Sequence, residues 1–338
     1  RAIQRSALRV KDAAINEYVQ SVACRVAGAY CPDLRIYIMR NPGFNASMTA
    51  NGIMQVWTGL LVRVSSEDEL AAILGHELAH YTQLHTLQRL ERLRKNMATG
   101  SLVDLGLILL TGTSVPLGQM AAVANLMAYN REQEEEADIL GVDFMAASDY
   151  DPHAAVKVWQ MLVKEDRNAV ARNREPGLFS KTHPSSKDRI RNLETFVEAH
   201  HATAGSTGKG LDRHVEILNQ YYLMLMEDQI DTNRFGRTEA ILDNHKAIGV
   251  DPGLVEFFRG EMYRQRKEEG DLQHAMEAYQ RAVSGEHPVA EAYLNLAYLQ
   301  LKQQDREAAG RNFRHYLELR PDAEDRAMIE YYLQEIQP

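Results

Sequence analysis

Residues 65–80 read SSEDELAAILGHELAH, and this stretch decides both the fold and the chemistry expected of the chain. Ser66 and Glu69 stand at capping-box spacing, and acidic residues fill the first turn that follows, which is favourable at the positive end of a helix. We therefore predict a helix that begins here and runs to about Lys95.

The pattern H-E-x-x-H lies within this predicted helix. His76 and His80 are four residues apart, so both side chains project from one face and can bind one zinc ion. Glu77 lies beside them, where its carboxylate can take a proton from a water molecule that the metal activates. His85 follows nine residues after His76. On a continuous helix that distance places it on the opposite side, so we expect a surface or structural role.

A catalytic zinc site needs a third protein ligand, which should come from a separate helix. Residues 131–138 read REQEEEAD and contain several candidates. Glu134 and Asp138 are four apart and share one helix face. One of them can bind the metal while the other holds a ligating histidine through its second ring nitrogen. A solvated acidic face is expected of the other glutamates, Glu132, Glu135 and Glu136.

Together, GHELAHYTQLH (75–85) and the R-x-x-E-x-x-A-D pattern of residues 131–138 resemble a zinc peptidase family. That family includes the CAAX prenyl proteases, the heat-shock protease HtpX and the periplasmic protease BepA, and the likeness covers residues 10–200 in layout. The resemblance implies a zincin-like (gluzincin) domain with one Zn²⁺ per chain. It also implies that Glu134 is the third ligand and that Asp138 supports the site.

A later segment, THPSSKDR (182–189), resembles a T-H-P segment of the same family. His183 precedes a proline, so we expect it in an extended loop. Two roles are open for its imidazole. It can donate a hydrogen bond to the oxyanion of the reaction, or it can take the open zinc position and keep the enzyme latent. Arg189 is expected to brace this loop by ion pairing.

Two segments before the catalytic helix, LRIYIMR (34–40) and NGIMQVWT (51–58), have the pattern of β-strands. In the family, the segment before the catalytic helix forms a sheet edge that pairs with an extended substrate peptide. We therefore assign this edge to Asn51, Gly52, Ile53, Met54 and Gln55. The preceding NASMTANG (45–52) lacks the aromatic residue and the proline usual there, so no side-chain specificity is predicted.

The composition changes at HHATAGSTGKG (200–210), a Gly/Ser/Thr-rich stretch typical of a linker. Residues 290–321 closely resemble a tetratricopeptide repeat, and 254–288 resemble a preceding unit with small and large residues in the same register. We expect a mainly α-helical chain with a small β-sheet. Its predicted domains are a zinc metallopeptidase domain (1–203), a linker (204–211) and a TPR-like helical repeat domain (212–338).

Charge and apolar patterning limit the partners. A net charge of −9, without a long basic stripe, argues against nucleic-acid binding. Residues 105–130 contain no charged residue, yet polar residues, Gly112 and Pro116 interrupt them. We expect a buried or membrane-touching helical hairpin, with peripheral membrane contact through 102–128, and no membrane span. Cys24 and Cys31 are compatible with either a disulfide or two thiols.

The resemblance to BepA, which also carries C-terminal tetratricopeptide repeats, implies a zinc-dependent endopeptidase of the bacterial periplasm. Its substrates would be unfolded or misassembled envelope proteins, and its repeats would bind a polypeptide or an assembly partner. The chain begins at Arg1 without a methionine, which fits an exported, processed product. The alternative is a chaperone or assembly factor whose zinc site is latent, although a structural zinc needs no base such as Glu77. A membrane-embedded prenyl-peptide protease would need several uninterrupted apolar spans.

Overall fold

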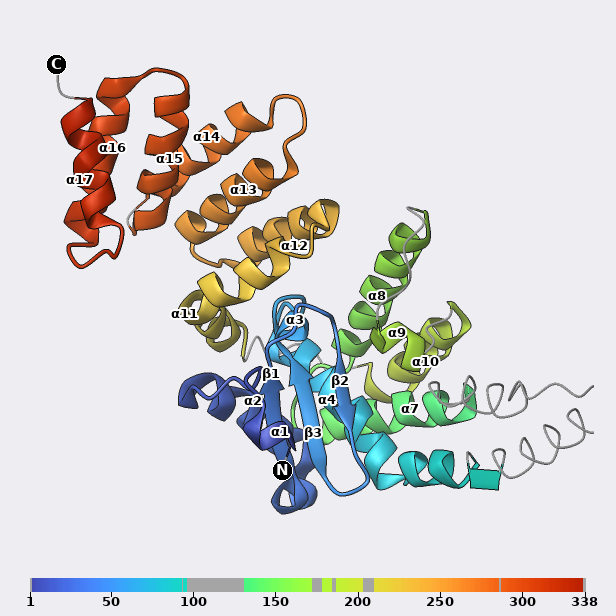
Figure 1. The fold of residues 1–338 in the computed structure, drawn as a ribbon. Coiled ribbons are helices and arrows are strands. Elements are labelled where there is room, and N and C mark those ends of the chain that lie inside the picture. Colours follow the sequence, from blue (N-terminus) through green and yellow to red (C-terminus); the bar gives the residue numbers. More distant parts are fainter. Residues whose placement is uncertain are drawn as a thin grey trace, which may run out of the picture. The chain divides into compact units, whose positions relative to one another are not determined.

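The computed structural model describes residues 2–92, 94–95, 131–171, 178–183, 187–202, 210–285 and 287–336. The chain divides into two compact units, Arg1–His214 and Val215–Pro338, and both are mainly helical (Figure 1). The division falls within α11 (Leu211–Ile230). The apolar stretch 102–128 and most of the predicted linker lie outside the described residues.

The first unit contains a three-stranded sheet of β1 (Arg35–Met39), β2 (Ala46–Met48) and β3 (Ile53–Trp57). The strand order is β1-β3-β2, with β3 parallel to β1 and antiparallel to β2. Met54 and Val56 of β3 are buried, while the alternate residues Ile53, Gln55 and Trp57 are half-buried. The two predicted strands therefore form, and the short β2 is added between them in sequence.

The strand order corrects one prediction. β3 is the central strand, so both of its sides are already hydrogen-bonded and it cannot accept a substrate peptide as an edge. The outer strand next to β3 is β2. After β1 the chain forms β2 first, and β3 then lies between β1 and β2. The segment wrongly predicted to form the sheet edge comprises Asn51, Gly52, Ile53, Met54 and Gln55.

Helix α4 (Glu67–Thr82) lies at the centre of the first unit, and every residue from Leu70 to His80 is buried. It packs against several other elements, including β2. Its burial on all sides explains why it lacks one distinct apolar face. None of the described helices is both long and apolar enough to cross a membrane. Among the described residues, the other helices of this unit are α1 (Ala2–Arg5), α2 (Ala13–Ala27), η1 (Gly28–Asp33), α3 (Thr58–Leu61), α7 (Arg131–Ala147), α8 (His153–Ala171), α9 (Leu178–Thr182) and α10 (Lys187–His201).

The start of α4 follows the prediction, whereas its end does not. The Ser66 side chain caps the helix by accepting the Glu69 N–H at 3.3 Å, and the Glu69 carboxylate accepts the Ser65 N–H at 2.7 Å. The helix ends at Thr82 rather than near Lys95. Leu84 has a left-handed backbone (φ 56°), and helical structure resumes over 85–92 in a new direction.

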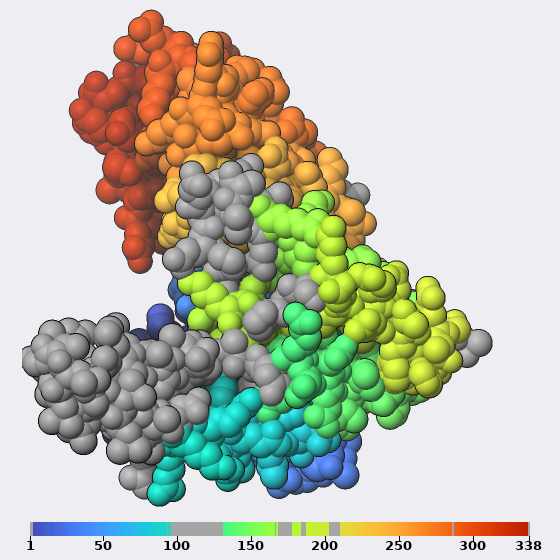
Figure 2. Space-filling model, turned by 90° about the vertical axis from the view of Figure 1, so that its right-hand side faces the viewer, coloured from blue at the N-terminus to red at the C-terminus, as the bar shows by residue number. Residues whose placement is uncertain are grey.

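Two glycines let α4 and α7 approach each other closely. A Cβ atom added to Gly141 would lie 3.0 Å from the backbone nitrogen of His76, and one added to Gly75 would lie 3.0 Å from the Gly141 carbonyl oxygen. Only residues without a side chain allow this backbone contact. Helix α7 also packs against α10, and the two lie next to each other, green and yellow-green, on the face shown in Figure 2.

Cys24 of α2 and Cys31 of η1 form a disulfide. It ties the end of α2 to the turn that leads into β1, the first strand of the sheet. Of the two alternatives left open by the sequence, the disulfide is therefore the one found.

The second unit is built from helical hairpins. Residues 254–288 and 290–321, predicted as repeats, correspond to the pairs α13/α14 and α15/α16, and the members of each pair pack together. A Cβ atom on Gly260 of α13 would lie 2.4 Å from the ring of Tyr279 in α14, which explains the small residue at that position. The helices after α11 are α12 (Phe235–Ile248), α13 (Pro252–Arg266), α14 (Asp271–Val283), α15 (Ala290–Lys302), α16 (Arg306–Leu319) and α17 (Arg326–Glu335).

Candidate metal centre

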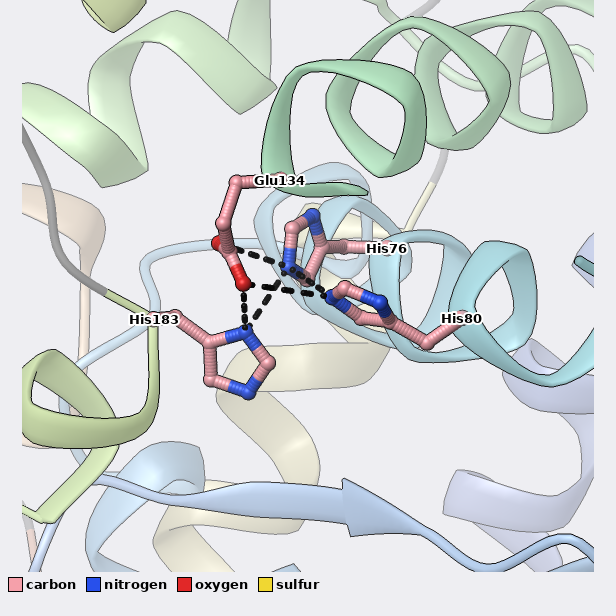
Figure 3. Close-up of side chains that lie close together, drawn as sticks. All are labelled: His76, His80, Glu134 and His183. Atoms are coloured by element: carbon pink, nitrogen blue, oxygen red, sulfur yellow. Dashed lines mark hydrogen bonds and ion pairs between the residues drawn. The ribbon is translucent and has the colours of Figure 1, made fainter. Parts of the chain in front are cut away.

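Four buried side chains from three parts of the first unit converge on one point (Figure 3). His76 and His80 come from adjacent turns of α4, Glu134 from the first turn of α7, and His183 from the residue that follows α9. One nitrogen or oxygen atom of each lies within 4.8 Å of the others. The two histidines and the glutamate predicted as ligands are thus brought together.

In five of the six pairs of these side chains, a donor atom of one lies 3.0–3.7 Å from a donor atom of the other. His76 Nε2 lies 3.1 Å from His80 Nε2 and 3.2 Å from His183 Nδ1, and Glu134 Oε1 lies 3.0 Å from His183 Nδ1. The Glu134 oxygens lie 3.7 Å from His76 Nε2 and 3.5 Å from His80 Nε2. Four donors each about 2.0–2.1 Å from a central zinc ion would stand about 3.3 Å apart, so the spacing fits this metal.

The protonation states also fit a cation. His76 Nδ1 lies 3.1 Å from the Asp138 carboxylate and must donate its proton there, which leaves a lone pair on Nε2. Burial lowers the pKa of His76, and it lowers those of His80 and His183 further, so all three rings are neutral near pH 7. Neutral imidazoles and a carboxylate are the forms that bind zinc.

Arg189 holds the acidic members of the site in place. Its guanidinium donates to both Asp138 oxygens, at 2.5 and 2.9 Å, and lies 2.6 Å from Glu134 Oε2. Burial alone would raise the pKa of Asp138, but the charge and hydrogen bonds of Arg189 outweigh it and the pKa is lowered. The guanidinium also stacks over the Trp159 ring at 4.6 Å. Arg189 therefore braces a metal ligand and the carboxylate that supports His76.

Glu77 lies beside the donor set and is almost completely buried. Its carboxylate accepts the backbone N–H of Met48 in β2, and Oε1 lies 3.2 Å from His183 Nε2. Burial, together with the negative charge of Glu134, raises the pKa of Glu77 well above its usual range. A carboxylate with a raised pKa is well suited to accept a proton near neutral pH.

His183 contacts both the ligands and this base. Its backbone N–H donates to the Phe179 carbonyl at 2.8 Å, and its ring stacks on the Phe179 ring with centroids 4.5 Å apart. It therefore stays hydrogen-bonded to the last turn of α9, which itself ends at Thr182. Its Nδ1 belongs to the donor set. Of the two roles left open, this position corresponds to a fourth ligand.

His85 lies at the site although its sequence position did not predict it. This side chain is only 1% exposed, and its Nδ1 lies 2.9 Å from His80 Nδ1, while its Nε2 lies 3.1 Å from Glu136 Oε2. The prediction of a surface or structural role on the opposite side assumed a continuous helix, and the break at Leu84 turns His85 back against His80. Of the three glutamates predicted on a solvated face, Glu132 and Glu136 are exposed and Glu135 is half-buried, and Glu136 also pairs with His85.

Comparison with known proteins gives two family matches. The family described as Peptidase family M48 matches residues 9–197, and a Tetratricopeptide repeat matches residues 290–323. The first covers the whole sheet and the donor set. The second covers the hairpin α15/α16.

Several individual proteins are similar to about half of this chain. The mitochondrial metalloendopeptidase OMA1 of Schizosaccharomyces pombe is 31% identical over 188 residues, which is 53% of this chain and 52% of that protein. A beta-barrel assembly-enhancing protease of Escherichia coli O157:H7 is 25% identical over 200 residues (56% and 40%). A Vibrio cholerae protein described in similar terms is 30% identical over 194 residues (54% and 39%). The chain thus spans about half, or less, of the length of the curated relatives it matches.

Proposed function

The chain belongs to peptidase family M48, and we propose that it is a zinc-dependent endopeptidase whose catalytic helix is α4. The observation that carries this proposal is the placement of a buried carboxylate, Glu77, beside a donor set of two histidines and a glutamate. A purely structural zinc site would need no base. The similarity to two kinds of named protease supports the same activity.

Each residue of the site has a distinct task in peptide hydrolysis. His76, His80 and Glu134 would hold zinc, which when bound lowers the pKa of water and polarises the substrate carbonyl. Glu77 takes a proton from the water as its oxygen adds to the peptide carbon. Glu77 then delivers that proton to the leaving amine nitrogen as the C–N bond breaks. Asp138 orients His76, and Arg189 holds Asp138 and Glu134.

We propose that the conformation described here is a latent one. His183 Nδ1 takes the fourth donor position, which a catalytic zinc keeps open for water. On the other side of the ring, His183 Nε2 lies 3.2 Å from the Glu77 carboxylate. Water and substrate can reach Glu77 only if this ring withdraws. The alternative of a chaperone or assembly factor shares this latency, but the burial and placement of Glu77 favour an enzyme that opens.

The substrate would bind in extended form along β2. This outer strand contacts α4, and the Met48 N–H in β2 hydrogen-bonds to Glu77, so a peptide added to its edge would pass the base. Backbone pairing of this kind favours unfolded chains over folded ones. The repeat unit would bind the same polypeptides or an assembly partner.

We place this activity in the bacterial periplasm, as envelope quality control. The Cys24–Cys31 disulfide supports an oxidising compartment, and the assembly-enhancing proteases named above support a bacterial envelope role. Peripheral membrane contact through residues 102–128 belongs to the same proposal, since that apolar stretch would bring the enzyme close to membrane-bound clients.

The test is cleavage of an unfolded model protein by the purified zinc-loaded chain, with Glu77→Gln as the matched variant. Zinc content is measured on both samples, because the substitution removes the base and none of the ligands. Because His183 blocks the site in this conformation, we expect the wild type to cleave slowly, and Glu77→Gln to bind equal zinc without cleaving. Equal cleavage by both proteins would rule out Glu77 as the base and reject the proposed mechanism.

A further inference from the structure

Beyond the three expected ligands, we propose that His85 and Glu136 are positioning residues that hold His80 in its metal-binding form. This inference rests on the proposed zinc site. His80 is completely buried, and its Nδ1 lies 2.9 Å from the Nδ1 of a second histidine, His85. Ligating histidines normally donate their second ring N–H to an acceptor that fixes the tautomer.

The proton positions on His80 and His85 follow from the Glu136 carboxylate at the end of this series of contacts. Two ring nitrogens 2.9 Å apart must share one proton, so one donates and the other accepts. His85 Nε2 lies 3.1 Å from the Glu136 carboxylate, which only accepts, so a neutral His85 ring in this position carries its one proton on Nε2. His85 Nδ1 then carries a lone pair and must accept the proton of His80 Nδ1.

This direction leaves His80 Nε2 without a proton, as metal binding requires. The opposite direction would place a proton on His80 Nε2, which faces His76 Nε2 at 3.1 Å and lies within the donor set. The Glu136 carboxylate therefore selects the metal-binding tautomer of His80 through His85. Asp138 does the same for His76 directly, at 3.1 Å from its Nδ1.

Further hydrogen bonds keep His85 in place between His80 and Glu136. Gln133 of α7 donates to the Gln88 side chain at 2.8 Å and accepts from Arg92 at 2.6 Å. These hydrogen bonds join the helical segment 85–92, which begins with His85, to the helix that carries Glu136. The break at Leu84 and these cross-links together fix the separation of His85 from both partners.

The experiment measures zinc affinity of the full chain by competition with a chromophoric chelator. His85→Ala and Glu136→Ala are each expected to weaken binding about 10- to 100-fold. His85→Asn, whose amide oxygen can accept from His80 Nδ1, should regain most of the loss. Glu136 is 49% exposed, so its variant folds even if the buried His85→Ala does not. Glu132→Ala, an exposed glutamate one turn earlier on α7, is the matched control and should bind zinc as the wild type does.

A spectroscopic readout separates positioning from general destabilisation. With ¹⁵N-labelled histidine, NMR of the zinc-loaded protein should show a proton on His80 Nδ1 in the wild type and its loss or exchange in Glu136→Ala. His214→Ala removes another fully buried histidine of the same unit, and should lower stability without changing zinc affinity. Unchanged affinity and an unchanged His80 tautomer in both His85→Ala and Glu136→Ala would overturn this inference and leave the zinc site intact. A wild type that binds no zinc would instead overturn the proposed function, and the inference with it.

Discussion

The close approach of α4 and α7 can be tested by Gly141→Ala. The added Cβ would lie 3.0 Å from His76 N, 3.1 Å from His76 Cα and 3.2 Å from the Gly75 carbonyl carbon. All three are backbone atoms of the catalytic helix, so the two helices must separate by a few tenths of an ångström. Overpacking of this kind costs about 1–3 kcal/mol, and replacing a helical glycine by alanine returns about 0.5–1 kcal/mol. We expect a net loss of about 1–2 kcal/mol.

The same separation also moves Glu134 and Asp138, which are carried by α7, away from the histidines of α4. Zinc affinity should therefore fall together with stability. Urea unfolding of the metal-free protein, followed by circular dichroism, measures the first effect, and chelator competition measures the second.

Gly310→Ala in α16 is the control for this substitution. Its Cβ would approach only the ends of side chains, the closest at 3.2 Å, so stability should be unchanged or slightly higher. If Gly141→Ala is as stable as the wild type and binds zinc equally well, the helix contact does not position the site and the reasoning is refuted.

Three further outcomes follow from individual contacts. His183→Ala should raise basal cleavage of an unfolded protein, since the fourth donor is removed, whereas a fall would assign His183 to oxyanion stabilisation. Hydrogen bonds from Arg266 lower the pKa of Asp271 in the folded protein. The ionised carboxylate therefore stabilises the fold fully at pH values above its ordinary pKa of about 3.9. This contribution is lost as the pH falls through the lowered pKa of the folded state. Asp271→Asn should thus cost about 1–3 kcal/mol at pH 7 in urea unfolding, and a cost that persists undiminished at strongly acidic pH would contradict this. Replacing Cys24 and Cys31 by serine should cost about 2–3 kcal/mol, and an unchanged melting temperature would argue against the disulfide.

Local patterns in the sequence predicted most of the metal centre. The Ser66 cap and the four-residue spacing of His76 and His80 depend on helix geometry alone, which the sequence encodes directly. Pairing Glu134 with Asp138 used the same spacing on a second helix. The meeting of these two helices needed the family resemblance, because the sequence gives no distance between segments so far apart.

What the sequence could not predict depends on tertiary structure. His85 appeared to face away from the site because nothing in the residues around Leu84 marks the helix break. The central position of β3, between β1 and β2, likewise depends on the order of strands in the sheet. The sequence could not predict it because side chains alternate in the same way on a central strand and on an edge strand. The two roles proposed for His183 both depend on its distance from the ligands, which the sequence does not give.

Crystals of the zinc-loaded protein, measured on both sides of the zinc absorption edge, test the central claim most directly. The account predicts one anomalous peak bonded to His76 Nε2, His80 Nε2 and the Glu134 carboxylate, with His183 Nδ1 as the fourth ligand. A zinc peak bound elsewhere, or no peak among these atoms at saturating zinc, would contradict the assignment of this chain as a zinc peptidase.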